Sequence, residues 1–170
     1  MQTIKLSLTI SAIVFLTFKG LAQNIKGTYA IKNVSTGMLL RVMDANKKNE
    51  TPIVAYSPTN WKCMTWDFNQ VEGHTYLLRN LFTGKTFQPQ KGEATEGISL
   101  EQQPFDNSKT YQQWEFISAP DNTYMIKLKG SDLFITPSDK SGTVNSKIIL
   151  AKKRADKTQY WSIYEQHPEM

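Results

Sequence analysis

The sequence predicts an all-β domain in which one four-stranded unit occurs three times. Two sets of aromatic residues carry this prediction, because each recurs at intervals of 47 and 48 positions. The tyrosines are Tyr29, Tyr76 and Tyr124, and the tryptophans are Trp66, Trp114 and Trp161. Each Tyr is followed by its Trp after 37 or 38 positions. A fixed period of this length is the signature of an internal structural repeat.

Within each repeat, alternating apolar and polar residues predict half-buried strands. The first repeat opens with such a pattern at 29–33 and closes with another at 66–68. Two further short apolar runs lie between them, at 39–42 and 53–56, separated by turn-forming Asp, Asn and Pro residues. In the second repeat we place the third run at 98–100. Helical periodicity is not sustained anywhere after the N-terminal segment, so four short strands are expected in each repeat.

Three copies of a unit that cannot bury its apolar face alone close naturally as a β-trefoil. Six of the twelve strands would then form a short barrel, and the other six would form hairpins that cap one end. The recurring tryptophans would meet near the pseudo-three-fold axis, so we expect them to be core residues and not sugar-stacking platforms. The expected repeats span about 27–72, 73–119 and 120–166.

The first 22 residues have the pattern of an export signal. Lys5 precedes an apolar run at 6–18, and residues 20–22, which read Gly-Leu-Ala, resemble a signal-peptidase site. A membrane anchor is the alternative, but the run is shorter than the roughly 18 to 20 residues that span a bilayer. We therefore expect a secreted or periplasmic domain of residues 23–170 without a membrane span.

The net charge and the single cysteine limit which partners and which covalent cross-links this protein can have. Without Lys5 and Lys19, the formal charge falls from +5 to +3, which gives little support for a nucleic-acid partner. Cys63 is the single cysteine, so an intrachain disulfide is excluded. We expect Cys63 to be a small buried residue beside the strand that contains Trp66. An intermolecular disulfide or a reactive thiol is the alternative.

The residue types that catalysis requires are sparse. The two histidines, His74 and His167, are far apart in the chain, and with Cys63 they suggest neither a zinc site nor a Cys-His pair. The sequence contains no phosphate loop and no dinucleotide fingerprint. Two carboxylates could still converge for glycoside hydrolysis. The trefoil uses the whole chain after the N-terminal segment, however, so we expect no enzymatic activity, no metal and no cofactor.

Short motifs at fixed places in the repeats resemble a known family. Residues 112–114 and 159–161 read Gln-x-Trp, whereas residues 64–66 keep the Trp and have Met in place of Gln. Residues 33–37 and 80–84 share the opening Asn-x-x-Thr-Gly. With three phased copies, the chain resembles the ricin-type β-trefoil lectins over almost its whole length after the N-terminal segment. The resemblance implies a trefoil fold and carbohydrate binding.

A sugar-binding repeat of that family has a carboxylate after the second-strand Leu, an aromatic residue ending the third strand, and an Asn beside the Gln-x-Trp. The carboxylate and amide would bind sugar hydroxyls, and the ring would cover the apolar face of the sugar. The resemblance places the carboxylate position at Arg41, Gln88 and Thr136. It places the aromatic position at Tyr56, Glu101 and Ala151, and the Asn position at Cys63, Tyr111 and Thr158. Every repeat therefore departs from the full set.

We accordingly predict altered or lost sugar recognition, with candidate sites in repeats one and two. The candidate carbohydrate-binding residues are Arg41, Asp44 and Tyr56 in repeat one, and Gln88, Glu101, Tyr111 and Gln112 in repeat two. The plainer interpretation is that Asp44 and Glu101 are solvated surface acids and that Tyr56 partly packs.

Repeat three has a cluster of basic residues instead of a sugar site. The cluster consists of Lys147, Lys152, Lys153, Arg154 and Lys157. A solvated charged face is one interpretation. The other is a site for an acidic polysaccharide, which would bind with salt-sensitive affinity.

Two functions of different classes follow from these observations. The first is an exported, non-catalytic, lectin-like module that binds glycans in shallow pockets between hairpin loops. The second is a trefoil that has lost sugar binding and binds a protein, with Trp61 and Phe105 as exposed interface anchors.

Overall fold

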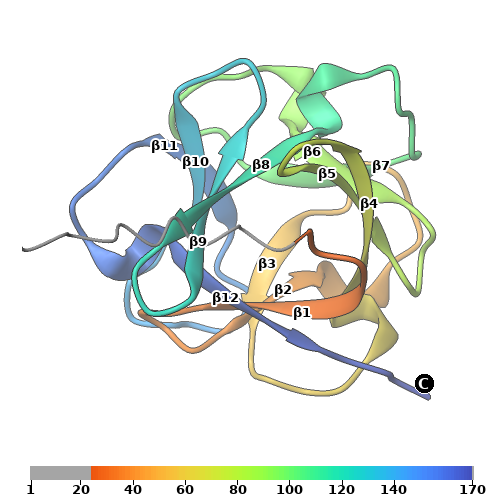
Figure 1. The fold of residues 1–170 in the computed structure, drawn as a ribbon. Helices are drawn as coiled ribbons and strands as arrows, with labels where there is room; N and C mark the ends of the chain where they lie inside the picture. The colour runs from red at the N-terminus through yellow and green to blue at the C-terminus, as the bar shows by residue number, and fades with distance from the viewer. Residues whose placement is uncertain (1–23, 170) are drawn as a thin grey trace, which may run out of the picture.

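A computed structural model describes residues 24–169 and confirms the all-β trefoil (Figure 1). The predicted signal segment, residues 1–22, lies outside the described residues. Repeat one contains β1 (Gly27–Asn33), β2 (Leu39–Val42), β3 (Ile53–Tyr56) and β4 (Thr65–Glu72). Repeat two contains β5 (Thr75–Asn80), β6 (Thr86–Pro89), β7 (Leu100–Gln103) and β8 (Trp114–Ala119). Repeat three contains β9 (Thr123–Leu128), β10 (Leu133–Pro137), β11 (Ile148–Lys152) and β12 (Tyr160–Glu165).

Helical structure in this part of the chain is limited to single 3₁₀ turns that join the strands. A turn follows the second strand in repeats one and two, at η1 (Met43–Ala45) and η3 (Gln90–Gly92). Another 3₁₀ turn precedes the fourth strand in every repeat, at η2 (Lys62–Met64), η4 (Thr110–Gln112) and η5 (Lys157–Gln159).

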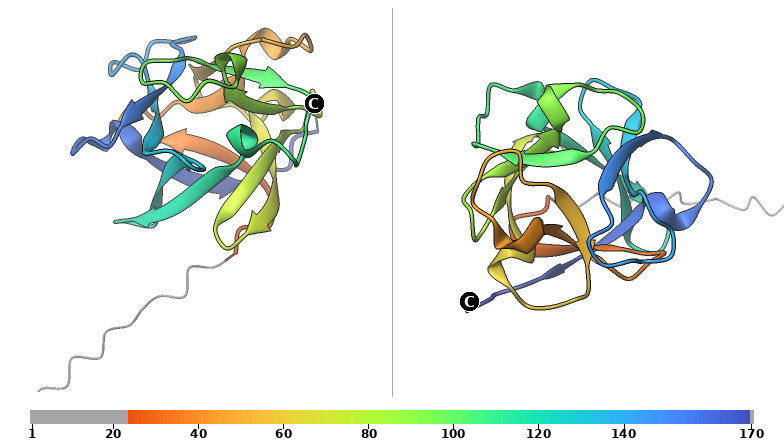
Figure 2. Two further views of the ribbon diagram at one scale, coloured as in Figure 1. Left: turned by 90° about the horizontal axis from the view of Figure 1, so that it is seen from above. Right: turned by 180° about the vertical axis from the view of Figure 1, so that it is seen from behind.

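The first and fourth strands of the repeats close a six-stranded barrel. Antiparallel ladders join β1 to β4, β4 to β5, β5 to β8, β8 to β9 and β9 to β12, and β12 pairs with β1. The second and third strands form the hairpins β2–β3, β6–β7 and β10–β11. The right-hand view of Figure 2 shows the resulting three lobes, one from each repeat, around a central axis.

The three repeated tryptophans are core residues, as predicted. Trp66, Trp114 and Trp161 are at most 1% exposed and belong to one hydrophobic cluster that spans all three repeats. Each indole Nε1 donates a hydrogen bond to the second strand of its own repeat, at Leu40, Phe87 and Ile135, over 3.2, 3.4 and 3.2 Å. Because the same bond occurs three times, the Trp fixes each hairpin to the barrel.

The hairpin ladders correct the predicted position of the third strand in repeat two. Strand β7 begins at Leu100, which pairs with Pro89, just as Ile53 pairs with Val42 in repeat one. The predicted run at 98–100 was therefore placed two residues early. The physical reason is burial, because Leu100 is fully enclosed in the core whereas Ile98 only packs against its edge.

This register changes which residues are equivalent. Glu101 pairs with Gln88 and therefore corresponds to Val54, which pairs with Arg41. Gln103 takes the position of Tyr56, because the two residues pair with the first residues of their hairpins, Thr86 and Leu39. The placement of Glu101 at the aromatic position of the family was thus wrong.

Neighbouring hairpins are joined by one repeated backbone exchange. In the exchange between repeats one and two, the amide of Glu50 donates to the carbonyl of Gln102 at 2.9 Å, and the amide of Gln102 donates to Thr51 at 2.8 Å. The two equivalent exchanges join Leu150 to residues 97–98 and Ala55 to residues 145–146. Each hairpin therefore places a short segment against the third strand of another repeat.

The Asn-x-x-Thr-Gly openings have a structural role. Asn33 Nδ2 donates to the carbonyl of Thr158 at 2.8 Å, and Asn80 Nδ2 donates to the carbonyl of Cys63 at 3.1 Å. Each buried amide therefore ties the start of one repeat to the end of another. Cys63 is a buried free thiol that packs with Leu39 and Met64, in agreement with a small core residue.

Candidate functional site

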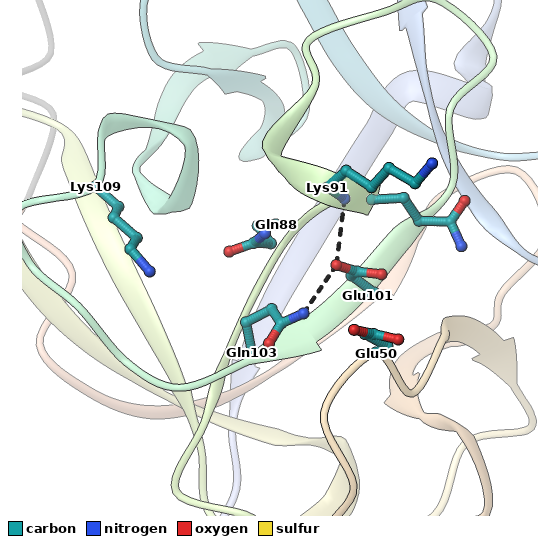
Figure 3. A pocket seen from close by; sticks show the side chains of 7 residues that line it. Glu50, Gln88, Lys91, Glu101, Gln103 and Lys109 are labelled. Carbon is teal, nitrogen blue, oxygen red and sulfur yellow. Dashed lines mark hydrogen bonds between the residues drawn. The ribbon is translucent and has the colours of Figure 1, made fainter.

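A pocket of about 560 Å³ opens beside the β6–β7 hairpin of repeat two. Figure 3 shows its polar side chains, which come from β6, η3, β7, the loop before η4 and, for Glu50, the preceding repeat. The lining residues are Glu50, Gln88, Gln90, Lys91, Glu101, Gln103 and Lys109. Acidic, basic and amide groups thus face one space, and only Gln88 and Glu101 were among the predicted site residues.

Glu101 presents one carboxylate oxygen to this pocket. Its Oε1 accepts hydrogen bonds from Gln103 Nε2 at 3.0 Å and from the amide of Lys91 at 3.3 Å (Figure 3). No described residue donates to Oε2, and no described Lys or Arg nitrogen lies within 4 Å of the carboxylate. The side chain is only 5% exposed, so its position is fixed by packing and by these two donors. The free oxygen is available to accept hydrogen bonds from a ligand.

Gln88 lies directly across the hairpin ladder from Glu101. Its Oε1 accepts a hydrogen bond from Gln112 Nε2 at 2.9 Å, which sets the orientation of the amide. Among residues 24–169, none accepts from Gln88 Nε2. Gln88 and Glu101 therefore offer a donor and an acceptor side by side on two paired strands.

Glu50 reaches the pocket from repeat one in a strained conformation. It occupies the first position of the segment that pairs with β7, and Gly97 and Asn145 occupy the equivalent positions in the other exchanges. All three have positive φ, at 63°, 85° and 65° for Glu50, Gly97 and Asn145. Glycine and asparagine tolerate this left-handed region, whereas a glutamate does so at a cost of roughly 1–2 kcal/mol. Such strain at a pocket is typical of residues kept for function.

Replacing Glu50 with glycine tests this interpretation. We expect Glu50→Gly to raise the free energy of unfolding by about 0.5–1 kcal/mol, because glycine adopts this φ without strain. Urea denaturation followed by tryptophan fluorescence measures the change. Glu93→Gly is the matched control, since Glu93 has a φ of −89° and should lose stability instead. A less stable Glu50→Gly protein would show that the Glu50 side chain stabilises the fold.

In repeat one, Arg41 covers the ring that was predicted to face a sugar. The Arg41 guanidinium lies 4.0 Å from the centroid of the Tyr56 ring and 5.9 Å from that of Trp61. Asp44 is exposed, has a φ of 53° and makes no ion pair with Arg41. The structure therefore brings Arg41 and Tyr56 together, with Arg41 on one face of the Tyr56 ring, and leaves Asp44 unpaired with Arg41.

Comparison with known proteins assigns the chain to a family. The sequence model of the family described as "Ricin-type beta-trefoil lectin domain-like" matches residues 17–103 and, in a second match, residues 62–151. The chain belongs to this family. A search of curated protein sequences finds no significant match.

Solved structures show the same fold at low identity. ThreeFoil, a designed 3-fold symmetric protein, superposes with a TM-score of 0.78 at 18% identity, covering 82% of this chain and 99% of its own. The Macrolepiota procera ricin B-like lectin, in complex with lactose, has a TM-score of 0.68 at 22% identity, covering 86% and 99%. The exo-β-1,3-galactanase 1,3Gal43A of Clostridium thermocellum has a TM-score of 0.76 at 21% identity, and this chain matches only 30% of it.

Two residues predicted to bind sugar in repeat two instead support the ricin-type fold. Gln112 of the Gln-x-Trp motif is buried, donates to Gln88 Oε1 and to the carbonyl of Pro104, and accepts from the amide of Asp106. Tyr111 lies against the η3 turn, where a Cβ added at Gly92 would lie 3.3 Å from its ring. Neither residue lines the pocket, so both assignments are corrected to supporting roles.

Five pocket residues were not among those predicted from the sequence: Glu50, Gln90, Lys91, Gln103 and Lys109. A signal for Gln103 was present, because the third strand of every repeat begins 24 positions after the repeat's Tyr. Counting from Tyr76 in this way places Gln103 at the position of Tyr56. Glu50 had no such signal, because it belongs to another repeat and reaches the pocket only through the backbone exchange.

Repeat three of the ricin-type domain has no equivalent polar pair. Thr136 is buried and donates a hydrogen bond to the carbonyl of Thr158, and its partner across the hairpin ladder is the apolar Ile149. The five residues of the basic cluster are all exposed. Lys147 stands apart from the rest, because it precedes β11 whereas the other four lie at or beyond its end.

An acid lies among the basic residues that follow β11. Asp156 accepts a hydrogen bond from Lys140 Nζ at 2.8 Å and others from the Thr158 hydroxyl and amide. These donors, Lys140 first, lower the pKa of the Asp156 carboxyl to about 2. The acid therefore stays negative and offsets part of the positive charge of the cluster.

The predicted interface anchors differ from each other in exposure. Trp61 is 37% exposed. Phe105 is half-buried, with the Arg79 guanidinium 4.4 Å from its ring centroid, so its prediction as an exposed anchor is wrong. Between residues 24 and 169, there is no group of three or more His, Cys, Asp or Glu that could hold a metal ion. The helices in the same range are too short to cross a membrane.

Proposed function

We propose that this ricin-type domain is an exported, non-catalytic module that binds glycans in the repeat-two pocket. The observation that carries the proposal is that an acceptor, Glu101 Oε2, and a donor, Gln88 Nε2, lie on neighbouring strands. No described protein group makes a hydrogen bond to either of them. Neighbouring sugar hydroxyls each donate and accept, so one pair of hydroxyls can satisfy both groups at once. A bond to the charged carboxylate is the stronger of the two.

The rest of the pocket suits a polar polymer and not an apolar ligand. Glu50, Gln90, Lys91, Gln103 and Lys109 add further donors and acceptors around the central pair. No aromatic ring lines the pocket, so the stacking contribution to sugar affinity is missing there. We therefore expect weak binding to a single sugar unit and firmer binding when several domains engage one polymer. The lactose complex of the Macrolepiota procera lectin, which has the same fold, supports this ligand class.

A glycan array with residues 23–170, run at low and moderate salt, tests the proposal. We expect selective binding of neutral glycans that changes little with salt, because the hydrogen bonds at Glu101 and Gln88 are short-ranged. Binding of acidic glycans alone that moderate salt abolishes would contradict the repeat-two site and indicate a basic site elsewhere on the domain. A blank array would contradict the proposal and favour a protein ligand.

The two remaining parts of the proposal have their own readouts. Glu50 and Glu101 both line the pocket, so every bound glycan is also incubated with the domain and assayed for new reducing ends. Release of reducing sugar would contradict the non-catalytic assignment. Export predicts that the protein recovered from the medium or periplasm begins at Gln23, and N-terminal sequencing that finds Met1 would contradict it.

A further inference from the structure

Arg41 is a buried charge without an anionic partner. It lies in the middle of β2, is 8% exposed, and has no carboxylate oxygen within 4 Å in the described part of the chain. Its Nε is fully enclosed and makes no hydrogen bond to any of residues 24–169. A guanidinium that is taken out of water is normally paired with an acid, because an unpaired buried charge is costly.

Two aromatic rings hold the guanidinium in place. Tyr56 lies beneath it at 4.0 Å, and Trp61 lies 5.9 Å away on the neighbouring turn. The ring centroids of Tyr56 and Trp61 are 6.2 Å apart with a tilt of 37°, so the two rings form adjoining walls. Cation–π contacts of this kind stabilise a charge but leave the N–H donors of the guanidinium unused. The enclosed Nε is out of reach of a ligand, but the terminal Nη groups make no hydrogen bond to residues 24–169 and are available to one.

The position of Arg41 in the repeat is the position of a pocket residue. By ladder register, Arg41 corresponds to Gln88, and Tyr56 corresponds to Gln103, both of which line the pocket of repeat two. Repeat one thus carries a cation where repeat two carries an amide. Asp44, on the turn after β2, is exposed and does not neutralise it.

We propose that repeat one binds the anionic group of an acidic sugar, a carboxylate or a sulfate, through Arg41. The planar guanidinium matches the oxygen pair of either anion. Trp61, which is 37% exposed, covers the apolar face of the same sugar ring, and Tyr56 holds Arg41 from the other side. This site shares with the proposed function only the premise that the domain binds glycans.

The first test observes Arg41 directly in the wild-type domain. The chain contains three arginines, Arg41, Arg79 and Arg154, so the Nε–H region of a ¹⁵N NMR spectrum is simple to assign. The probes are disaccharides ending in glucuronate, galacturonate or a 6-sulfated hexose, each titrated beside its uncharged parent sugar. We expect an acidic probe to shift the Arg41 Nε–H signal and to leave those of Arg79 and Arg154 unchanged. Equal shifts with the parent sugars, or no Arg41 shift, would overturn the proposal.

Variants then measure the preference for the acidic sugar by calorimetry. We expect the wild-type domain to bind the acidic probe at least about tenfold more tightly than its parent, because a charged hydrogen-bonded pair contributes that much. Arg41→Gln should reduce this ratio to about one, and Arg154→Gln, in the exposed basic cluster, should leave it unchanged. Trp61→Ala should lower the affinity for the acidic probe and for its parent sugar by a similar factor.

If the affinity ratio between the acidic probe and its parent sugar fell to about one in Arg154→Gln but not in Arg41→Gln, the acidic site would lie in repeat three and the proposal would be overturned. Thermal melting of each variant shows whether it is folded. If Arg41→Gln does not fold, the NMR titration still tests the proposal, because it uses the wild-type domain. Glu101→Gln separates this site from the repeat-two pocket. That variant should keep the preference for the acidic probe even if neutral glycans no longer bind.

Discussion

Replacing Trp114 with alanine is expected to remove much of the stability of the domain. The side chain is completely buried in the cluster that all three repeats share, and its Nε1 donates to the carbonyl of Phe87. Removing a buried Trp costs about 3–5 kcal/mol, and the lost hydrogen bond leaves the Phe87 carbonyl without its partner. Domains of this size are stable by only about 5–15 kcal/mol, so one such change removes much of the total.

Denaturant unfolding of wild type and Trp114→Ala measures this loss, with β-sheet circular dichroism as the signal. Trp61→Ala is the matched control, because Trp61 is 37% exposed and lies outside the shared core. We expect the control to lose about 1 kcal/mol or less. Similar losses at the two positions would contradict the assignment of Trp114 to the core that joins the repeats.

Replacing Glu101 with glutamine is expected to weaken the binding of neutral glycans strongly without unfolding the domain. Glutamine has the same shape, and its carbonyl can still accept from Gln103 Nε2 and from the amide of Lys91. The second oxygen of Glu101, which faces the pocket, becomes an NH₂ group that donates instead of accepting. Loss of a charged acceptor, with a donor in its place, should weaken binding by about 10- to 100-fold.

Calorimetric titration with the strongest neutral glycan from the array measures this effect. Glu93→Gln is the control, because Glu93 is an exposed acid on the turn after η3 and does not line the pocket. Its affinity should match that of the wild type. Unchanged affinity in Glu101→Gln, at wild-type thermal stability, would show that glycans do not bind beside Glu101.

The fold could be predicted from the sequence because the patterns that indicate it are local and repeated. The runs at 39–42 and 53–56 coincide with β2 and β3, since alternation and turn residues act over a few positions. The period of the Tyr and Trp residues identified the trefoil and its core. The third strand of repeat two was misplaced, because Ile98 and Leu100 are both apolar and only burial separates them.

The site depended on contacts that join distant parts of the chain. Gln88 and Glu101 were found because each lies in a recurring strand position of a single repeat. Gln112 and Tyr111 have the right spacing, yet their side chains pack against Gln88 and the η3 turn and not into the pocket. Spacing along a strand indicates which face a residue occupies, but it does not indicate which neighbour covers it.

The sequence by itself therefore determined the three-fold repeat, the buried tryptophans and the family of this protein. Only the tertiary structure decided that Glu50 of repeat one completes the pocket of repeat two, and that Arg41 covers Tyr56 without an acidic partner among residues 24–169. The physical reason is that periodicity records what each repeat buries, whereas a binding site is formed by side chains that meet across hairpins and between repeats.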